Sequence, residues 1–205
     1  MTRIANNRTQ WKLLAKAAKK IKSRGFNEYF ELKRLSQKTD PSSRRELQTR
    51  FANYYRLHIG GLTNAFKRRY LELLLTCKPR GKRDPYTSLL LELYRFPRRK
   101  GDRALQVSFV SKLVAFHDES RPLYDVHVKN FFGFSPPSVG PIEFRIAGFV
   151  ANLQNIQSQY ESWAANPRFS KIMQPLFKKN PLLQKCHPTR LCDFLVWTVG
   201  AYDLK

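Results

Sequence analysis

The sequence predicts an all-α protein, a globular fold of many helices. Apolar residues recur at three- and four-residue steps along most of the chain, and no segment shows the sustained alternation of a strand. Pro and Gly separate these periodic segments, as expected of loops between helices. The 205 residues are 42% hydrophobic and include 15 Phe, 9 Tyr and 3 Trp, which is enough to bury a core.

The N-terminal part of the chain predicts four helices. Apolar residues on one face and lysines on the other predict the first helix over 11–21, and a second apolar stripe predicts the next over 26–35. The sequence Ser-Arg-Arg-Glu at 43–46 has the spacing of a capping box and predicts the start of a third helix. The glycines at 60–61 interrupt that helix, and the apolar pattern resumes over 62–75.

The remaining segments continue the helical pattern between Pro- and Gly-containing loops. Helices are predicted at about 87–94, from the loop at 96–103 to about 116, from about 125, and at about 142–164, 168–178 and 188–200. We divide the chain into a basic N-terminal helical region, 1–84, and a helical region that carries the candidate site, 85–205. The alternative is one continuous two-lobed domain.

The charge is concentrated toward the N-terminus. The formal net charge is +23, and residues 1–103 hold 27 basic and 8 acidic side chains, against 11 and 7 in residues 104–205. Self-repulsion of this size destabilises a compact protein, and a polyanion relieves it because each neutralised phosphate releases counterions. The charge therefore predicts a nucleic-acid partner, most simply duplex DNA. An anionic membrane surface is the weaker alternative, and an acidic protein partner is a third.

Two Gly-containing loops carry clustered cations that suit phosphate contact, since backbone N–H groups approach an anion closely at such turns. They bracket one predicted helix, and their convergence on one surface is one alternative; two solvated loops are the other. The expected nucleic-acid-binding residues are Lys78, Arg80, Lys82 and Arg83 in the first loop and Arg98, Arg99, Lys100 and Arg103 in the second.

The stretch 107–134 holds the most distinctive polar residues. An apolar helix ends near His117, and a short turn leads to Tyr124 and Asp125 at the start of another helix. Asp at this position is expected to cap the helix by accepting free N–H groups. With apolar neighbours on both sides, the same carboxylate also suits stabilisation of a cation or orientation of a water. A pairing with His117 or His127 would allow acid–base chemistry.

The segments 111–116 and 122–128 resemble the helix–turn–Asp–helix passage of the helix-hairpin-helix DNA glycosylases. That resemblance implies an all-α protein that binds duplex DNA, flips a base out of the stack and cleaves its N-glycosidic bond. It also implies that Asp125 is the catalytic residue, with Tyr124, His127, Lys112 and Phe131 as candidates for the base pocket. Residues 191–197 are similar to the C-terminal packing helix of relatives of this fold.

Two departures from the family pattern refine this expectation. The Gly-containing hairpin signature is absent, and its nearest substitute is the single glycine of Arg99–Asp102. No lysine stands at 106–109, where the bifunctional members carry their lyase residue, and Lys112 lies about one turn too late. The resemblance therefore implies a monofunctional glycosylase of base excision. The alternative is a non-catalytic protein that binds DNA or RNA on the same helical scaffold.

The sequence gives little support to other classes of protein. The three cysteines, Cys77, Cys186 and Cys192, have no paired spacing, which predicts reduced thiols and no zinc site. The glycine motifs that bind phosphates or dinucleotides are absent, so no cofactor is expected. The spacing of the histidines and Asp125 matches no standard ligand set, so no metal is expected. Without an apolar run of about 20 residues, no membrane span is expected either. We expect a cytoplasmic, nucleoid-associated location or a nuclear one.

Overall fold

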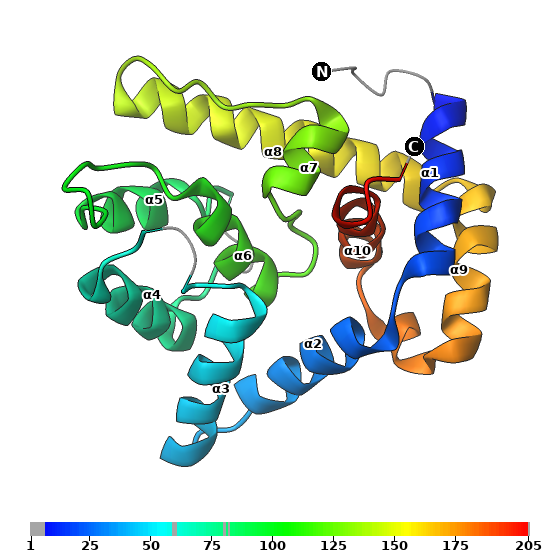
Figure 1. The fold of residues 1–205 in the computed structure, drawn as a ribbon, viewed down its shortest axis with the longest axis horizontal. Helices are drawn as coiled ribbons and strands as arrows, with labels where there is room; N and C mark the ends of the chain where they lie inside the picture. The colour runs from blue at the N-terminus through cyan, green and yellow to red at the C-terminus, as the bar shows by residue number, and fades with distance from the viewer. Residues whose placement is uncertain (1–6, 59–60, 80, 82, 205) are drawn as a thin grey trace. The chain divides into compact units, whose positions relative to one another are not determined.

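The computed structural model describes residues 7–58, 61–79, 81 and 83–204 of the chain. Within these ranges the chain forms ten α-helices and one 3-10 helix (Figure 1), and its extended pairing is limited to a single bridge between Leu62 and Arg98. The predicted all-α fold is therefore confirmed. No helix in the described part of the chain is long and apolar enough to cross a membrane.

The chain forms two compact units. The central unit consists of residues 22–113, and the terminal unit consists of residues 1–21 together with 114–205. This grouping differs from the sequence division at residue 84, because the first helix packs on helices near the C-terminus rather than on those that follow it in the chain. Helix α6 runs across the boundary between the two units.

The central unit contains α2 (Ser23–Ser36), α3 (Pro41–Tyr54), α4 (Asn64–Thr76), α5 (Thr87–Tyr94) and the first part of α6 (Val107–His117). Its core is rich in aromatic rings: Phe51, Phe66 and Tyr70 are buried, and the Phe66 and Tyr70 rings stack with centroids 6.0 Å apart. The Tyr70 hydroxyl donates a hydrogen bond of 2.7 Å to the Phe109 carbonyl, which ties α4 to α6.

The predicted start of α3 was wrong, because the helix is capped by Asp40 rather than by Ser43. Asp40 is the N-cap, its carboxylate accepts the N–H of Ser43 at 2.8 Å, and Pro41 occupies the first turn. Ser43 is thus a buried first-turn residue rather than the cap. Both residues are good caps, and the fixed φ of Pro41 favours the earlier start because proline is preorganised for the first helical position.

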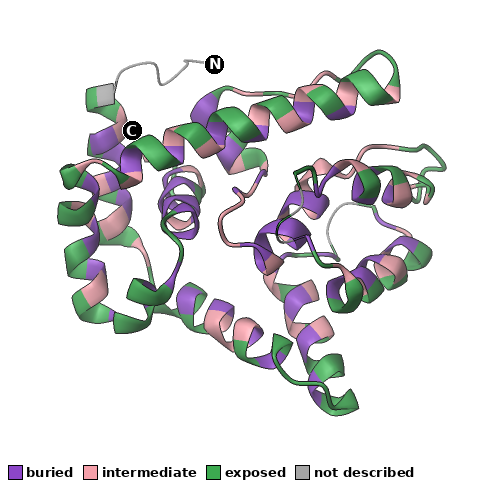
Figure 2. Ribbon diagram, turned by 180° about the vertical axis from the view of Figure 1, so that it is seen from behind, coloured by how far each residue is buried: buried purple, intermediate pink, exposed green. Residues whose placement is uncertain are grey.

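The terminal unit contains α1 (Asn7–Lys20), the end of α6, α7 (Val126–Phe132), α8 (Ile142–Ala164), α9 (Pro167–Lys179), η1 (Pro181–Lys185) and α10 (Pro188–Ala201). Helix α10 is its centre: nine of its residues are buried, and it packs on α7, α1 and α8 (Figure 2). Trp163 of α8 is buried and touches Trp11 of α1 and Phe131 of α7.

Candidate functional site

Asp125 caps α7, as the sequence predicted. It is half-buried, and its Oδ1 atom accepts the backbone N–H groups of His127 at 2.9 Å and Val128 at 3.0 Å. The helix ends at Phe132, and its C-cap is Gly133, whose φ of +69° suits a residue without a Cβ. The turn from α6 therefore delivers a carboxylate to a helix N-terminus, and any further chemical role of that carboxylate stays a prediction.

A buried ion pair holds the turn that carries Asp125. Arg190 and Asp193 of α10 are each 1% exposed at the side chain, and Arg190 Nη1 lies 2.8 Å from Asp193 Oδ2. Arg190 Nη2 donates to the Ala115 carbonyl at 2.9 Å and to the Arg121 carbonyl at 3.4 Å. The Asp193 carboxylate accepts the Leu123 N–H at 3.1 Å. The end of α6 and the middle of the 118–125 turn are thus fixed to α10.

Burial dominates the electrostatics of this pair. It raises the pKa of the Asp193 carboxyl to about 7, while Arg190 and the Leu123 N–H favour the ionised form. The buried Tyr160 hydroxyl interacts with the same carboxyl, and burial raises the pKa of that hydroxyl well above its ordinary value. The pair was not predicted as part of the site. The signal in the sequence is an Arg and an Asp three residues apart on a helix that is otherwise apolar.

The aromatic residues near Asp125 in the sequence pack inside the terminal unit. Tyr124 is buried, its ring meets Phe149 edge-on at 5.4 Å, and its hydroxyl donates to the Phe134 carbonyl at 2.8 Å. Burial raises the pKa of Tyr124 to about 12, so the hydroxyl keeps its proton at neutral pH. Phe131 is buried against Trp163 at 5.9 Å. A role for either ring beside a bound base stays a prediction.

His127 and Lys112 have different surroundings. The His127 ring lies edge-on to Trp197 of α10 with centroids 5.4 Å apart, and a Cβ built on Gly200 would lie 2.6 Å from His127 Nδ1. Lys112 belongs to the central unit, where its Nζ lies 5.9 Å from the Tyr55 ring centroid and 5.4 Å from that of Phe109. Among the described residues, no cluster of three or more His, Cys, Asp or Glu could hold a metal ion.

The second basic loop is a tight turn fixed to the start of α4. The Arg98 carbonyl accepts the N–H of Gly101 at 2.9 Å, and Gly101 has φ +85°. Arg99 N donates to the Gly61 carbonyl at 2.8 Å. Arg98 forms an ion pair with Asp102, which lowers the pKa of that carboxyl. Arg98 thus stabilises the turn, and three exposed cations remain on it: Arg99, Lys100 and Arg103.

The first basic loop lies at the other end of α4. Lys78 and Arg83 are exposed, and Arg80 and Lys82 lie outside the described residues. Lys78 follows the last residue of α4 by two positions, whereas the second loop is bonded to residues that precede α4. Thirteen helical residues span about 20 Å, so the two loops are separated by the length of this helix and do not converge.

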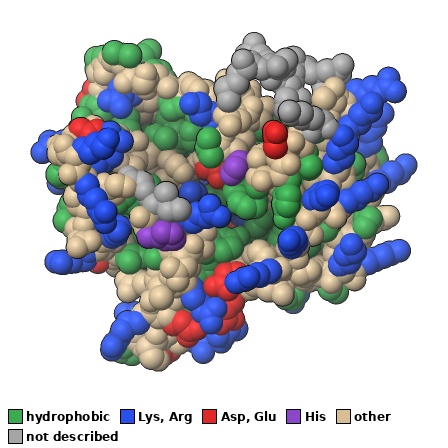
Figure 3. Space-filling model, viewed as in Figure 1, with side chains coloured by type: hydrophobic (Ala, Val, Ile, Leu, Met, Phe, Trp, Pro, Cys, Tyr) green, Lys and Arg blue, Asp and Glu red, His purple; other side chains and the backbone are tan. Residues whose placement is uncertain are grey.

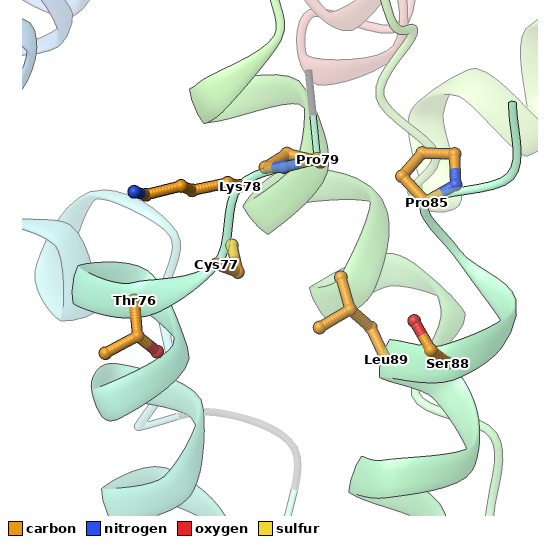
Figure 4. Close-up of a pocket in the computed structure, with 7 residues that line it drawn as sticks. All are labelled: Thr76, Cys77, Lys78, Pro79, Pro85, Ser88 and Leu89. Carbon is orange, nitrogen blue, oxygen red and sulfur yellow. The ribbon is translucent and has the colours of Figure 1, made fainter. Parts of the chain in front are cut away.

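A small pocket adjoins the first loop (Figure 4). Its volume is about 260 Å³, and it lies between the end of α4 and the start of α5. The Lys78 side chain extends away from Pro85 and Leu89 in this view, so it does not fill the pocket. The pocket is lined by Thr76, Cys77, Lys78, Pro79, Pro85, Ser88 and Leu89.

All eight carboxylates of the central unit have structural partners. Six of them pair with only four arginines: Glu31 with Arg34, Glu28 and Glu46 with Arg50, Glu72 and Glu92 with Arg69, and Asp102 with Arg98. The other two, Asp40 and Asp84, accept backbone N–H groups at helix starts. The unit contains 22 Lys and Arg residues, so its basic residues greatly outnumber its eight carboxylates.

Comparisons with family models, with curated proteins and with solved structures find no match to this chain. The resemblance to the helix-hairpin-helix glycosylases therefore stays a prediction from sequence. The structure shows a helical protein of two units, with a large excess of basic over acidic residues and a carboxylate fixed at the start of α7.

Proposed function

We propose that this protein binds nucleic acid through contacts with phosphates. The observation that carries the proposal concerns the charged residues of the central unit. Every carboxylate there already has a structural partner, and exposed Lys and Arg residues remain. Arg99, Lys100 and Arg103 are exposed on one turn and form no ion pair among the described residues. Such an excess of one sign costs stability in the free protein, and phosphates remove that cost while releasing counterions.

The geometry of the turn supports phosphate contact. Its backbone is fixed by the bonds to Gly61 and within Arg98–Asp102, so Arg99 and Lys100 belong to a hydrogen-bonded turn and Arg103 directly follows it. Phosphate contacts position a duplex without reading its sequence. The proposed binding is therefore independent of sequence and strongly dependent on salt.

A triple substitution tests this proposal. Arg99→Gln, Lys100→Gln and Arg103→Gln together are expected to weaken binding to all duplex sequences alike. The slope of log affinity against log salt concentration should become shallower by about 2.7, because each lost phosphate contact contributes about 0.9. The affinity is measured by fluorescence anisotropy with several random duplexes.

A matched control separates local contact from total charge. Arg34→Gln, Arg50→Gln and Arg69→Gln remove the same charge from arginines that already pair with carboxylates. The control variant should keep most of the salt slope. Equal losses in the two variants, or a loss confined to one duplex sequence, would contradict the assignment of the turn to phosphates.

Hydrolysis of an N-glycosidic bond is a second candidate, favoured by Asp125. This carboxylate stands at the N-terminus of α7 directly after a turn from α6, which is the arrangement the resemblance implies. Both cap bonds use Oδ1, so Oδ2 makes neither of them. In this candidate function, Asp125 stabilises the positive charge that develops on the sugar as the base departs and orients the water that attacks it.

Asp125→Asn tests the enzymatic candidate without removing the cap, because Asn caps helices as well as Asp. The variant is expected to fold and to bind DNA as the wild type does, but to form no abasic sites. Asp40→Asn, the same change at another helix cap, should keep the activity. Absence of alkali-labile sites with the wild type on a panel of duplexes with modified bases would leave binding alone.

A further inference from the structure

The terminal unit carries a second cationic surface, separate from the loops considered above. It consists of the exposed Lys and Arg residues of α1, α9 and η1, here called the α1–α9 face: Arg8, Lys12, Lys16, Lys19, Lys20, Arg168, Lys171, Lys178, Lys179 and Lys185. The segments 7–21 and 162–192, which contain these elements, include no Asp or Glu. The segments that carry these ten exposed cations thus contribute no carboxylate to the surface.

The two helices of this face lie side by side. Helix α1 packs on α9, and α9 packs on η1. Figures 1 and 3 share one view, in which Lys and Arg side chains gather over α1 and α9. The cations therefore lie on neighbouring helices of one unit.

The positions of these cations are unfavourable for the isolated helices. Arg8 and Arg168 lie in the first turns of α1 and α9, where the helix dipole disfavours positive charge and neither helix has an acidic residue. Along α1, Arg8, Lys12, Lys16 and Lys20 follow one another at four-residue steps, so like charges are neighbours on the helix surface. Only the pairs at the helix C-termini, Lys19–Lys20 and Lys178–Lys179, have a favourable dipole interaction.

The apolar sides of both helices are already covered. Trp11, Leu14 and Ala17 of α1 are buried, as are Phe169 and Met173 of α9. A basic amphipathic helix that lies on a membrane inserts its apolar side among the lipids. Here that side forms the core of the unit, so α1 and α9 present mainly charged side chains to a partner. This favours a highly charged polyanion over a bilayer.

The spacing along α1 also suits a nucleic-acid backbone. Four residues rise about 6 Å along a helix. Alternate phosphates of one strand are about 7 Å apart along the axis of a duplex. A row of cations at four-residue steps can therefore follow a strand over the length of α1.

From these observations we infer that the α1–α9 face is a second nucleic-acid-binding surface, which contacts phosphates independently of the 98–103 turn. This inference rests on the proposed function and extends it, because it gives each of the two units its own phosphate contacts.

Substitutions on α1 and α9 test the inference. Lys12→Gln, Lys16→Gln, Lys171→Gln and Lys178→Gln together keep good helix formers in the helices. If all four residues contact phosphates, the salt slope for a random duplex should become shallower by about 3.6. In a variant that combines these four substitutions with the three at residues 99, 100 and 103, the two reductions in salt slope should add. Circular dichroism checks that the variant is folded.

The outcomes distinguish this inference from the proposed function. If the wild type binds duplex and the α1–α9 variant keeps the full salt slope, the second surface is wrong and the proposed function stands. If the wild type binds no nucleic acid, both are wrong. Binding to vesicles with about 30% anionic lipid, without binding to duplex or single-stranded DNA, would also overturn the inference.

Chemical protection of the wild type gives a second test that needs no variant. An amine-reactive reagent followed by mass spectrometry measures the reactivity of Lys12 and Lys171 with and without duplex. The inference expects both to be protected at least about fivefold, while Lys129, an exposed residue of α7, keeps its reactivity. Equal protection of all three lysines, or protection of none, would contradict a surface on α1 and α9.

Discussion

At the scale of single residues, the buried guanidinium of Arg190 is the strongest constraint on the Asp125 turn. It donates hydrogen bonds to the carbonyls of Ala115, near the end of α6, and Arg121, within the turn. Its charge is balanced by Asp193. Removing one member of such a pair leaves a charge in the protein interior without compensation, which costs more than the pair contributes when intact.

Arg190→Met is therefore expected to lower the free energy of unfolding by about 3–5 kcal/mol, as measured by urea denaturation. The double variant Arg190→Met with Asp193→Asn should recover part of this loss, because no buried charge remains and the amide oxygen still accepts the Leu123 N–H. A double variant less stable than the single variant would contradict a buried ion pair at this position.

Of the two residues Asp125 and Arg190, only the first has a role that could be predicted from the sequence. The cap at Asp125 was predictable because capping depends on local positions along the chain. The role of Arg190 was not, because its partners Ala115 and Arg121 are about 70 residues away in the sequence and meet it only in the folded unit. Periodicity reports which side of a helix is buried, and not which loop lies against it.

At the scale of elements, close contact between α7 and α10 requires a residue without a side chain. Gly200 lies within α10, and a Cβ there would meet His127 at 2.6 Å. Glycine lowers helix stability by about 1 kcal/mol relative to alanine. Its presence here is explained by packing.

Gly200→Ala is expected to destabilise the protein by about 1–3 kcal/mol, because the overlap with His127 outweighs the gain in helix propensity. Gly25→Ala is the matched control: it lies in α2 with no atom within 4 Å of the added Cβ and should raise stability by up to about 1 kcal/mol. Thermal unfolding measures both. A stabilised Gly200→Ala variant would show that α7 and α10 are not in close contact.

The start of α3 makes a prediction about pH. Hydrogen bonds from Ser42 and Ser43 hold the pKa of Asp40 well below its usual range. A carboxyl whose pKa is lower in the folded state stabilises the fold above its unfolded pKa of about 4, and this contribution is lost as the pH falls. The melting temperature of Asp40→Ala should therefore differ from the wild type at pH 6 and approach it toward pH 2.

Asp40→Asn supplies the control for this titration. The amide does not titrate and still caps the helix, so its difference from the alanine variant should stay constant with pH. If the gap between wild type and Asp40→Ala were the same at pH 6 and pH 2, the ionised carboxylate would not be the group that stabilises α3.

Helix positions were largely predictable because apolar period and proline act locally. The predicted segments 87–94 and 142–164 coincide with α5 and α8. The 3-10 helix η1 was not predicted, because five residues between α9 and α10 are too short to show a period. The opposite placement of the two basic loops also escaped prediction, since it depends on how α5 folds back along α4.

At the scale of the whole molecule, composition predicts a polyanionic partner but not where it binds. The sequence places most of the excess charge in residues 1–103, yet α1 joins the C-terminal helices, so both units are basic. The central unit holds 22 basic and 8 acidic residues, and the terminal unit holds 16 and 7. This redistribution follows from packing of α1 on α9 and α10 and has no local signal in the sequence.

The proposed contacts between exposed Lys and Arg residues and phosphates are tested most directly by the affinity of the wild type for a random duplex as salt rises from about 50 to 200 mM. If six or more phosphates are engaged, the slope should be about −5 or steeper and the affinity should fall about a thousandfold. An affinity that does not change over this range would show that the protein does not bind through phosphate contacts.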